Sequence, residues 1–100
     1  MKTDIQEIDG KVVATLVGEM DTAAAVEVEE KLRPLYENEG KDIVFDCKDL
    51  EYIASSGLRI MLRILKGARA KGRSVVMRNV NDDIKNVFEL TGFINIFTFE

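Results

Sequence analysis

The sequence has 100 residues, of which 46% are apolar and 32% are charged, and its formal net charge is −4. These values indicate one globular domain, and the acidic balance argues against direct nucleic acid binding. Because the chain has no histidine and one cysteine, it cannot build a Ser-His-Asp or Cys-His catalytic site or an ordinary zinc site. We therefore expect no enzyme activity, no metal and no cofactor.

No apolar run approaches the length of a membrane span, and residues 1–4 lack the apolar region of a signal peptide. The lone Cys47 cannot form an internal disulfide, which fits a reducing compartment, and we expect it to be a small buried residue. These features predict a cytoplasmic protein that does not insert into a membrane.

The first elements along the chain are those of a hairpin. Two extended runs, residues 5–8 and 12–17, flank the Asp9-Gly10 pair, which is typical of tight hairpin turns. Gly18 is predicted to end the second of these strands.

A first helix is predicted to follow, with Asp21 or Thr22 as its cap. Its apolar residues recur at helical spacing, namely Ala25, Val28, Leu32, Leu35 and Tyr36. Pro34 is expected to kink the last turn of this helix, and Gly40 is expected to end it.

The second half of the chain alternates strands and helices. Residues 41–46 are predicted to form a buried strand that ends at Asp46, where the carboxylate satisfies loop N–H groups; the loop covers residues 46–56. A second helix begins at the serines after this loop and ends at Gly72, with an apolar face made by Leu58, Met61, Leu62, Leu65 and Ala68. Residues 74–77 form a third buried strand. Asn81 caps a last helix, and residues 93–99 supply a short final strand.

The predicted order is β-β-α-β-α-β-α with a short final β. This alternation indicates an α/β fold with a mixed, mostly parallel sheet of four to five strands and three to four helices. The turn at residues 18–21 and the loop at residues 46–56 both follow strands. Because functional loops of open α/β sheets lie at the carboxyl ends of strands, we expect these two segments to share one edge of the molecule.

The most informative motif is Ser55-Ser56-Gly57, which stands where the second helix should begin. Serine is a favourable helix N-cap, so the motif has a structural interpretation. The free N–H groups and the dipole at a helix start also attract anions. A serine at this position is therefore able to carry a phosphate without damaging its own helix.

With these motifs in this order, the chain resembles the STAS domain, the fold of bacterial anti-sigma factor antagonists. The resemblance covers essentially all of residues 1–100 as a single STAS-like domain. It rests on four segments: the Gly18-Glu19-Met20-Asp21 turn, the strand ending in Asp46, the Ser55-Ser56-Gly57-Leu58 helix start and the late Leu90-Thr91-Gly92-Phe93.

The resemblance implies a non-enzymatic partner-switch protein that regulates sigma-factor-dependent transcription, typically in a bacterial stress response. Such a protein binds an anti-sigma factor serine kinase and thereby frees the sigma factor. Phosphorylation of a serine by the kinase ends this binding, and a metal-dependent serine phosphatase reverses it. We expect the chain itself to be a monomer or weak dimer.

Carried onto this sequence, the resemblance assigns phosphorylation to Ser55, with Ser56 as the less favoured choice. The expected partner-binding residues are Asp21, Thr22, Ala54, Ser55, Ser56, Gly57 and Arg59. Asp21 also has a simpler interpretation as a helix cap. Arg59, Arg63 and Lys66 are interpreted first as the solvated side of an amphipathic helix, and second as a basic ridge that meets an acidic partner.

One residue departs from the family pattern. Phosphorylated members usually have an aspartate directly before the serine, and this sequence has Ala54 there. The departure keeps an alternative open, namely a constitutive STAS interaction subunit of a lipid-transport ATPase or of a stress-signalling scaffold. A nucleotide-binding domain ranks last, because the sequence contains no Gly-x-x-x-x-Gly-Lys-Ser/Thr loop.

Overall fold

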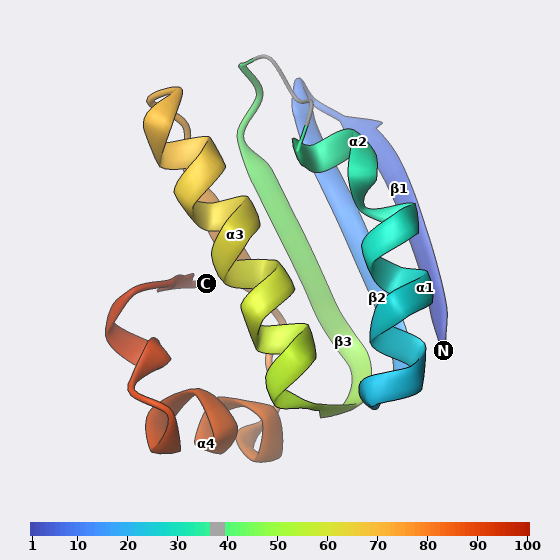
Figure 1. The fold of residues 1–100 in the computed structure, drawn as a ribbon. Coiled ribbons are helices and arrows are strands. Elements are labelled where there is room, and N and C mark those ends of the chain that lie inside the picture. The colour runs from blue at the N-terminus through green and yellow to red at the C-terminus, as the bar shows by residue number, and fades with distance from the viewer. Residues whose placement is uncertain (37–39) are drawn as a thin grey trace.

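The computed structural model describes residues 1–36 and 40–100, and within them five strands form one sheet in the order β1-β2-β3-β4-β5 (Figure 1). β1 and β2 pair antiparallel, and every other neighbouring pair is parallel. The strands are β1 (Lys2–Ile8), β2 (Lys11–Met20), β3 (Ile43–Ile53), β4 (Val75–Arg78) and β5 (Thr98–Phe99). The mixed, mostly parallel α/β sheet predicted from the sequence is confirmed.

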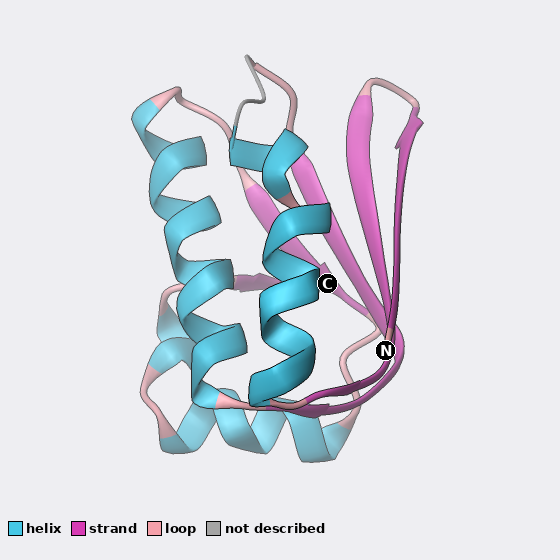
Figure 2. Cartoon of the chain, turned by 45° about the vertical axis from the view of Figure 1, so that its right-hand side comes forward, coloured by secondary structure: helices cyan, strands magenta, loops and turns pink. Residues whose placement is uncertain are grey.

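The helices form a second layer on one face of this sheet. They are α1 (Thr22–Lys31), α2 (Arg33–Tyr36), α3 (Ser55–Ala70) and α4 (Asp82–Leu90), with a 3-10 turn at Phe93–Asn95. α1 and α3 lie side by side over the strands, and α4 lies across one end of the molecule (Figures 1 and 2). No helix in the described ranges is long and apolar enough to cross a membrane.

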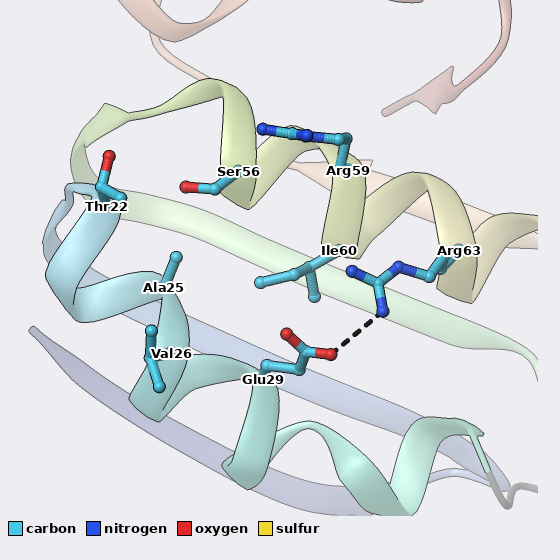
Figure 3. A pocket seen from close by; sticks show the side chains of 8 residues that line it. All are labelled: Thr22, Ala25, Val26, Glu29, Ser56, Arg59, Ile60 and Arg63. Carbon is cyan, nitrogen blue, oxygen red and sulfur yellow. Dashed lines mark hydrogen bonds and ion pairs between the residues drawn. The ribbon is translucent and has the colours of Figure 1, made fainter.

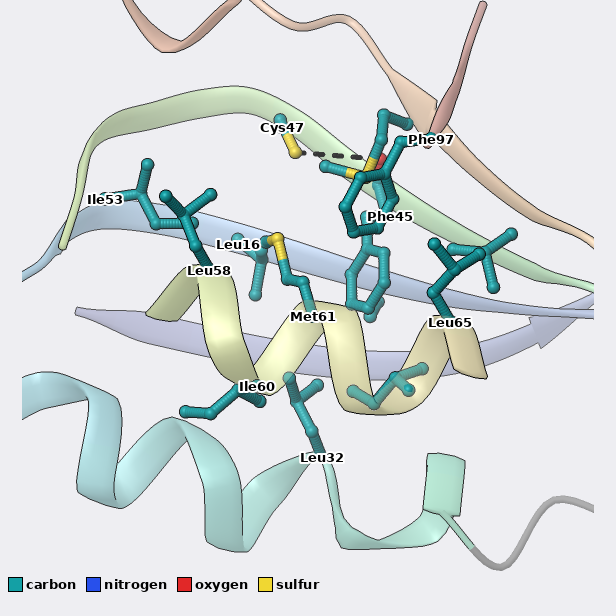
Figure 4. Close-up of a cluster of buried hydrophobic side chains, with 14 of the residues drawn as sticks. Leu16, Leu32, Phe45, Cys47, Ile53, Leu58, Ile60, Met61, Leu65 and Phe97 are labelled. Carbon is teal, nitrogen blue, oxygen red and sulfur yellow. Dashed lines mark hydrogen bonds between the residues drawn. The ribbon is translucent and has the colours of Figure 1, made fainter. Parts of the chain in front are cut away.

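The core lies between the sheet and the α1–α3 layer, where Leu16, Phe45 and Met61 pack together (Figure 4). All three side chains are fully buried or nearly so. Phe88 joins α4 to the C-terminal segment through edge-to-face contacts with Phe97 and Phe99, at centroid distances of 5.4 and 5.5 Å. Burial of this apolar surface is the main force that holds the two layers together.

The hairpin turn is confirmed in its backbone geometry. Asp9 and Gly10 have φ angles of 53° and 77°, and positive φ at both central residues is what the tight hairpin turns of this type require. The predicted end of the second strand at Gly18 is wrong, because β2 continues to Met20. Gly18, at φ 102°, instead sits beside a register shift in the β2–β3 pairing, which a residue without a Cβ accommodates.

The predicted loop over residues 46–56 is also wrong for most of its length, since β3 runs on to Ile53. Its extension pairs with the extended end of β2, so each strand satisfies backbone groups of the other. Exposed charged residues gave this stretch its loop-like composition, but Leu50 and Ile53 are buried in the core. Two register shifts bend the pairing between the two strands.

Pro34 breaks the first helix rather than kinking it. α1 ends at Lys31, and the short α2 begins at Arg33. The cause is that proline has no N–H to donate to the carbonyl four residues earlier. α2 is described as far as Tyr36, and residues 37–39, between it and the predicted stop at Gly40, lie outside the described residues. At the C-terminus, the predicted strand over residues 93–99 is reduced to β5, preceded by the 3-10 turn.

Candidate functional site

The carboxyl ends of β2 and β3 meet at one edge of the sheet, as predicted. The N–H of Ala54 donates to the carbonyl oxygen of Met20 at 2.8 Å, which ties the two strand ends together. α1 starts directly after Met20 and α3 directly after Ala54. Two helix N-termini, and therefore two partly positive helix ends, face the same side of the molecule.

Asp21 is the N-cap of α1. Its Oδ1 accepts a hydrogen bond from the N–H of Ala24 at 2.8 Å, and its carbonyl accepts from the N–H of Ala25 at 2.9 Å. Thr22 is the first helical residue, so of the two predicted cap candidates Asp21 is confirmed. Both residues are exposed. The carboxylate compensates the start of α1 and still faces solvent.

The prediction that a serine caps the second helix is wrong. Because β3 continues to Ile53, the cap position falls on Ala54, whose side chain accepts no hydrogen bond. Ser55 and Ser56 are the first two helical residues, and the first intrahelical bond runs from the N–H of Leu58 to the carbonyl of Ala54. The opening N–H groups of α3 therefore lack both an intrahelical acceptor and a side-chain cap.

The residues around this helix start differ in exposure. Ser55 is exposed, whereas Ser56 is half-buried and its Oγ is fully buried with no hydrogen-bond partner in the described residues. Arg59 is exposed. Of the seven predicted partner-binding residues, Asp21, Thr22, Ser55 and Arg59 therefore present surface to solvent.

Ala54 and Gly57, which were expected on the partner-facing surface, are buried and offer a partner little surface of their own. A Cβ added to Gly57 would lie 2.6 Å from Sδ of Met20 and 3.0 Å from Cγ1 of Ile53. The glycine allows α3 to approach the ends of β2 and β3 closely. Ala54 and Gly57 therefore support the exposed residues at the start of α3 without being exposed themselves.

A groove of about 270 Å³ runs between α1 and α3 from this edge (Figure 3). Thr22 and Ser56 lie at its mouth, and Val26 and Ile60 line its walls. Farther along the groove, the guanidinium of Arg63 pairs with the carboxylate of Glu29 at 3.0 Å. The groove was not predicted from the sequence. The residue that could have indicated it is Val26, an apolar residue outside the buried stripe of α1, which the structure shows to be 68% exposed.

Arg59 differs from Arg63 in its contacts. It lines the same groove, but no hydrogen bond or ion pair joins it to any residue that the structure describes. Its side chain runs back along α3 toward Ser56 and the helix start (Figure 3). The basic ridge considered for Arg59, Arg63 and Lys66 is thus partly neutralised at Arg63.

Cys47 is fully buried, as expected. Burial raises the pKa of its thiol to about 12, and the nearby charge of Asp46 adds to this effect. Asp46 accepts hydrogen bonds through Oδ1 from the backbone N–H of Lys48 and the side-chain amide of Asn79, each at 3.2 Å. The cysteine is a packing residue, and Asp46 satisfies nearby N–H groups within a longer strand than predicted.

Comparison with known proteins matches the chain to one protein family and to individual relatives. The family model described as the STAS domain matches residues 2–100. The chain is 33% identical over 97 residues to BtrV of Bordetella bronchiseptica, which is assigned as an anti-sigma factor antagonist, and the match covers 97% of this chain and 84% of BtrV. It is 28% identical over 96 residues to the anti-sigma-B factor antagonist of Bacillus subtilis, covering 96% and 87% of the two chains.

Among solved structures, the fold matches the anti-sigma factor antagonist SpoIIAA from Bacillus. The TM-score is 0.81 for the unphosphorylated form and 0.75 for the phosphorylated form, at 19% sequence identity in both. Each match covers 99% of this chain, with 88% of the first SpoIIAA chain and 91% of the second. At this identity the likeness establishes a shared fold.

Proposed function

The chain belongs to the STAS domain family, and from this membership together with the geometry of the site we propose that it is an anti-sigma factor antagonist that works by partner switching. In its unphosphorylated form it binds an anti-sigma factor serine kinase and frees a sigma factor for transcription. Two relatives that it matches over nearly its whole length are described as anti-sigma factor antagonists, which supports the proposal.

The observation that carries this function is the position of Ser55. It is an exposed serine in the first turn of α3, at the edge where α1 also begins. A kinase reaches an exposed hydroxyl without opening the fold. The Oγ of Ser56 is buried, so its modification would require α3 to fray first. These facts favour Ser55 as the phosphorylated residue.

A phosphate at Ser55 would act on binding rather than on folding. It adds a charge of about −1.5 to −2 at neutral pH, and free N–H groups at a helix start accommodate an anion. Buried against a partner without a matching cation, the same charge costs several kcal/mol. A loss of about 4 kcal/mol weakens binding about a thousandfold.

The remaining parts of the proposal follow from this role. The chain performs no reaction of its own, because the kinase partner adds the phosphate and a metal-dependent serine phosphatase removes it. Asp21, Thr22, Ser55 and Arg59 provide the partner-facing surface. Sigma factors act on cytoplasmic transcription, so the cytoplasm is the proposed location, and the working form is a monomer or weak dimer.

Ala54 favours a second candidate, a constitutive STAS interaction subunit of a transport ATPase or a signalling scaffold. The family's phosphorylated members usually have an aspartate at this position, and Ala54 supplies no carboxylate next to Ser55. Under this alternative, the same surface binds a partner permanently and is never phosphorylated.

The test uses the serine-kinase anti-sigma factors encoded in the source genome, each purified and titrated with this protein by calorimetry. We expect one kinase to bind the wild type and the Ser55→Ala variant with similar affinity and to bind Ser55→Asp at least a hundredfold more weakly. With ATP, that kinase should phosphorylate the wild type and Ser56→Ala but not Ser55→Ala. Failure of every kinase to bind, or equal binding of Ser55→Asp, would contradict the proposal.

A further inference from the structure

The start of α3 is unusually positive. α1 begins with the carboxylate of Asp21 and α4 begins with Asn81 followed by two aspartates. α3 is the longest helix of the described ranges, yet it has neither a side-chain cap nor an acidic residue in its first turn. The partial positive charge at this helix end therefore has no compensating side chain on its own helix.

Arg59 increases this positive charge. Its side chain runs back toward the helix start (Figure 3), where a cation interacts unfavourably with the helix dipole. No acidic residue of the described ranges pairs with it, whereas Arg63 in the same groove pairs with Glu29 at 3.0 Å. Next to it in the groove lining, Ser56 has a buried Oγ with no hydrogen-bond partner among the described residues. The Arg59 cation and the free N–H groups thus lie at the same end of α3.

Ser55 lies within reach of this cluster. Residues four positions apart on a helix are surface neighbours, so Ser55 and Arg59 share one face of α3. A guanidinium binds a phosphate through two parallel hydrogen bonds, which is among the strongest polar contacts in proteins. Residue 54 is alanine, so no carboxylate stands directly before Ser55 in the sequence.

We propose that Arg59 is a phosphate-holding residue: once Ser55 is phosphorylated, the Arg59 guanidinium and the N-terminal N–H groups of α3 bind the phosphate within the same chain. This inference rests on the proposed function, since it takes Ser55 as the modified residue. Phosphorylation then has two effects on the partner-facing surface. It adds a bulky anion, and it engages an arginine that was previously available to the partner.

Two carboxylates on the α1 side, those of Asp21 and Glu29, lie at this edge and in the groove, and both already have partners. Asp21 lies at the start of α1 and uses Oδ1 to cap that helix. Glu29 of α1 is paired with Arg63 farther along the groove. Arg59 is therefore the cation whose removal should change the pKa of the phosphate most. Arg63 provides a matched control on the same helix and in the same groove.

The experiment places phosphoserine at position 55 by genetic code expansion and follows the phosphate by ³¹P NMR as the pH is changed. The second pKa of an unperturbed phosphoserine is about 6. We expect Arg59→Gln to raise the phosphate pKa by about 0.5 to 1 unit relative to the phosphorylated wild type, because a nearby cation favours the dianion. Arg63→Gln should leave it unchanged. Equal pKa values in wild type and Arg59→Gln, or an equal rise in Arg63→Gln, would overturn the proposal.

Two controls separate this result from other failures. Unphosphorylated Arg59→Gln should unfold in urea at or slightly above the wild-type midpoint, because Arg59 is exposed, makes no hydrogen bond or ion pair with the described residues and carries a charge that the helix dipole disfavours. The phosphate is installed without a kinase, so the NMR result does not depend on whether a kinase partner is found. Conversely, an unchanged phosphate pKa would leave kinase binding and Ser55 phosphorylation as separate questions with their own tests.

Discussion

Gly57→Ala should destabilise the domain through one close contact. The added Cβ would lie 2.6 Å from Sδ of Met20 and 3.0 Å from Cγ1 of Ile53. Met20 is fully buried and Ile53 is 2% exposed, so neither side chain can move into solvent. Overpacking of this kind costs about 1–3 kcal/mol. Alanine recovers about 1 kcal/mol through its helix propensity, so we expect a net loss of up to about 2 kcal/mol.

The assay is equilibrium unfolding in urea, with Gly67→Ala as the matched control. Gly67 lies in the same helix, and a Cβ there would meet nothing within 4 Å. That variant should gain about 0.5–1 kcal/mol, because alanine costs less backbone entropy than glycine in a helix. If Gly57→Ala were as stable as the wild type while Gly67→Ala showed its gain, the argument that a glycine is needed between α3 and the strand ends would fail.

Three further outcomes follow from the structure. Asp21→Ala should lower the free energy of unfolding by about 1 kcal/mol in urea, because the cap on the Ala24 N–H is lost, and no loss would contradict the cap. Asn81→Ala should cost about 1–2 kcal/mol, since Asn81 both caps α4 and donates to the carbonyl of Leu50 at 3.0 Å. For Cys47, the thiol pKa of about 12 in the fold lies above its ordinary value of 9.0, so the unfolded chain loses the thiol proton first. The free energy of unfolding should therefore fall as the pH rises from 9 toward 12, and it should fall less steeply in Cys47→Ala. The same decline with pH in both proteins would contradict the raised pKa of the Cys47 thiol.

The order of strands and helices was predictable because it follows from local patterns. Apolar spacing predicted α3, and turn residues such as Asp9 and Gly10 predicted the hairpin. The capping roles of Asp21 and Asn81 were also visible, since a side-chain oxygen before an apolar helical stripe has one dominant structural use. Such features depend on residues close together in the sequence.

The features that were missed depend on residues far apart in the sequence. The extension of β3 to Ile53 is stabilised by pairing with the end of β2, and the composition of either segment alone indicates a turn or loop. That extension moved the helix cap from a serine to Ala54. The groove between α1 and α3 likewise became visible only with the helices placed side by side. So did the contrast between Arg63, which pairs with Glu29, and Arg59, which pairs with no residue in the described part of the chain.

The central claim is that phosphorylation of Ser55 controls partner binding, and the most direct measurement is phosphopeptide mass spectrometry. The protein would be recovered from its native cells during growth and after stress, and the bound partners would be quantified in the same samples. We predict phosphate on Ser55 and not on Ser56, with an occupancy that changes with stress and falls as the bound anti-sigma factor rises. An unmodified Ser55 in both conditions, with a partner bound equally in each, would contradict the claim and identify a constitutive binding subunit.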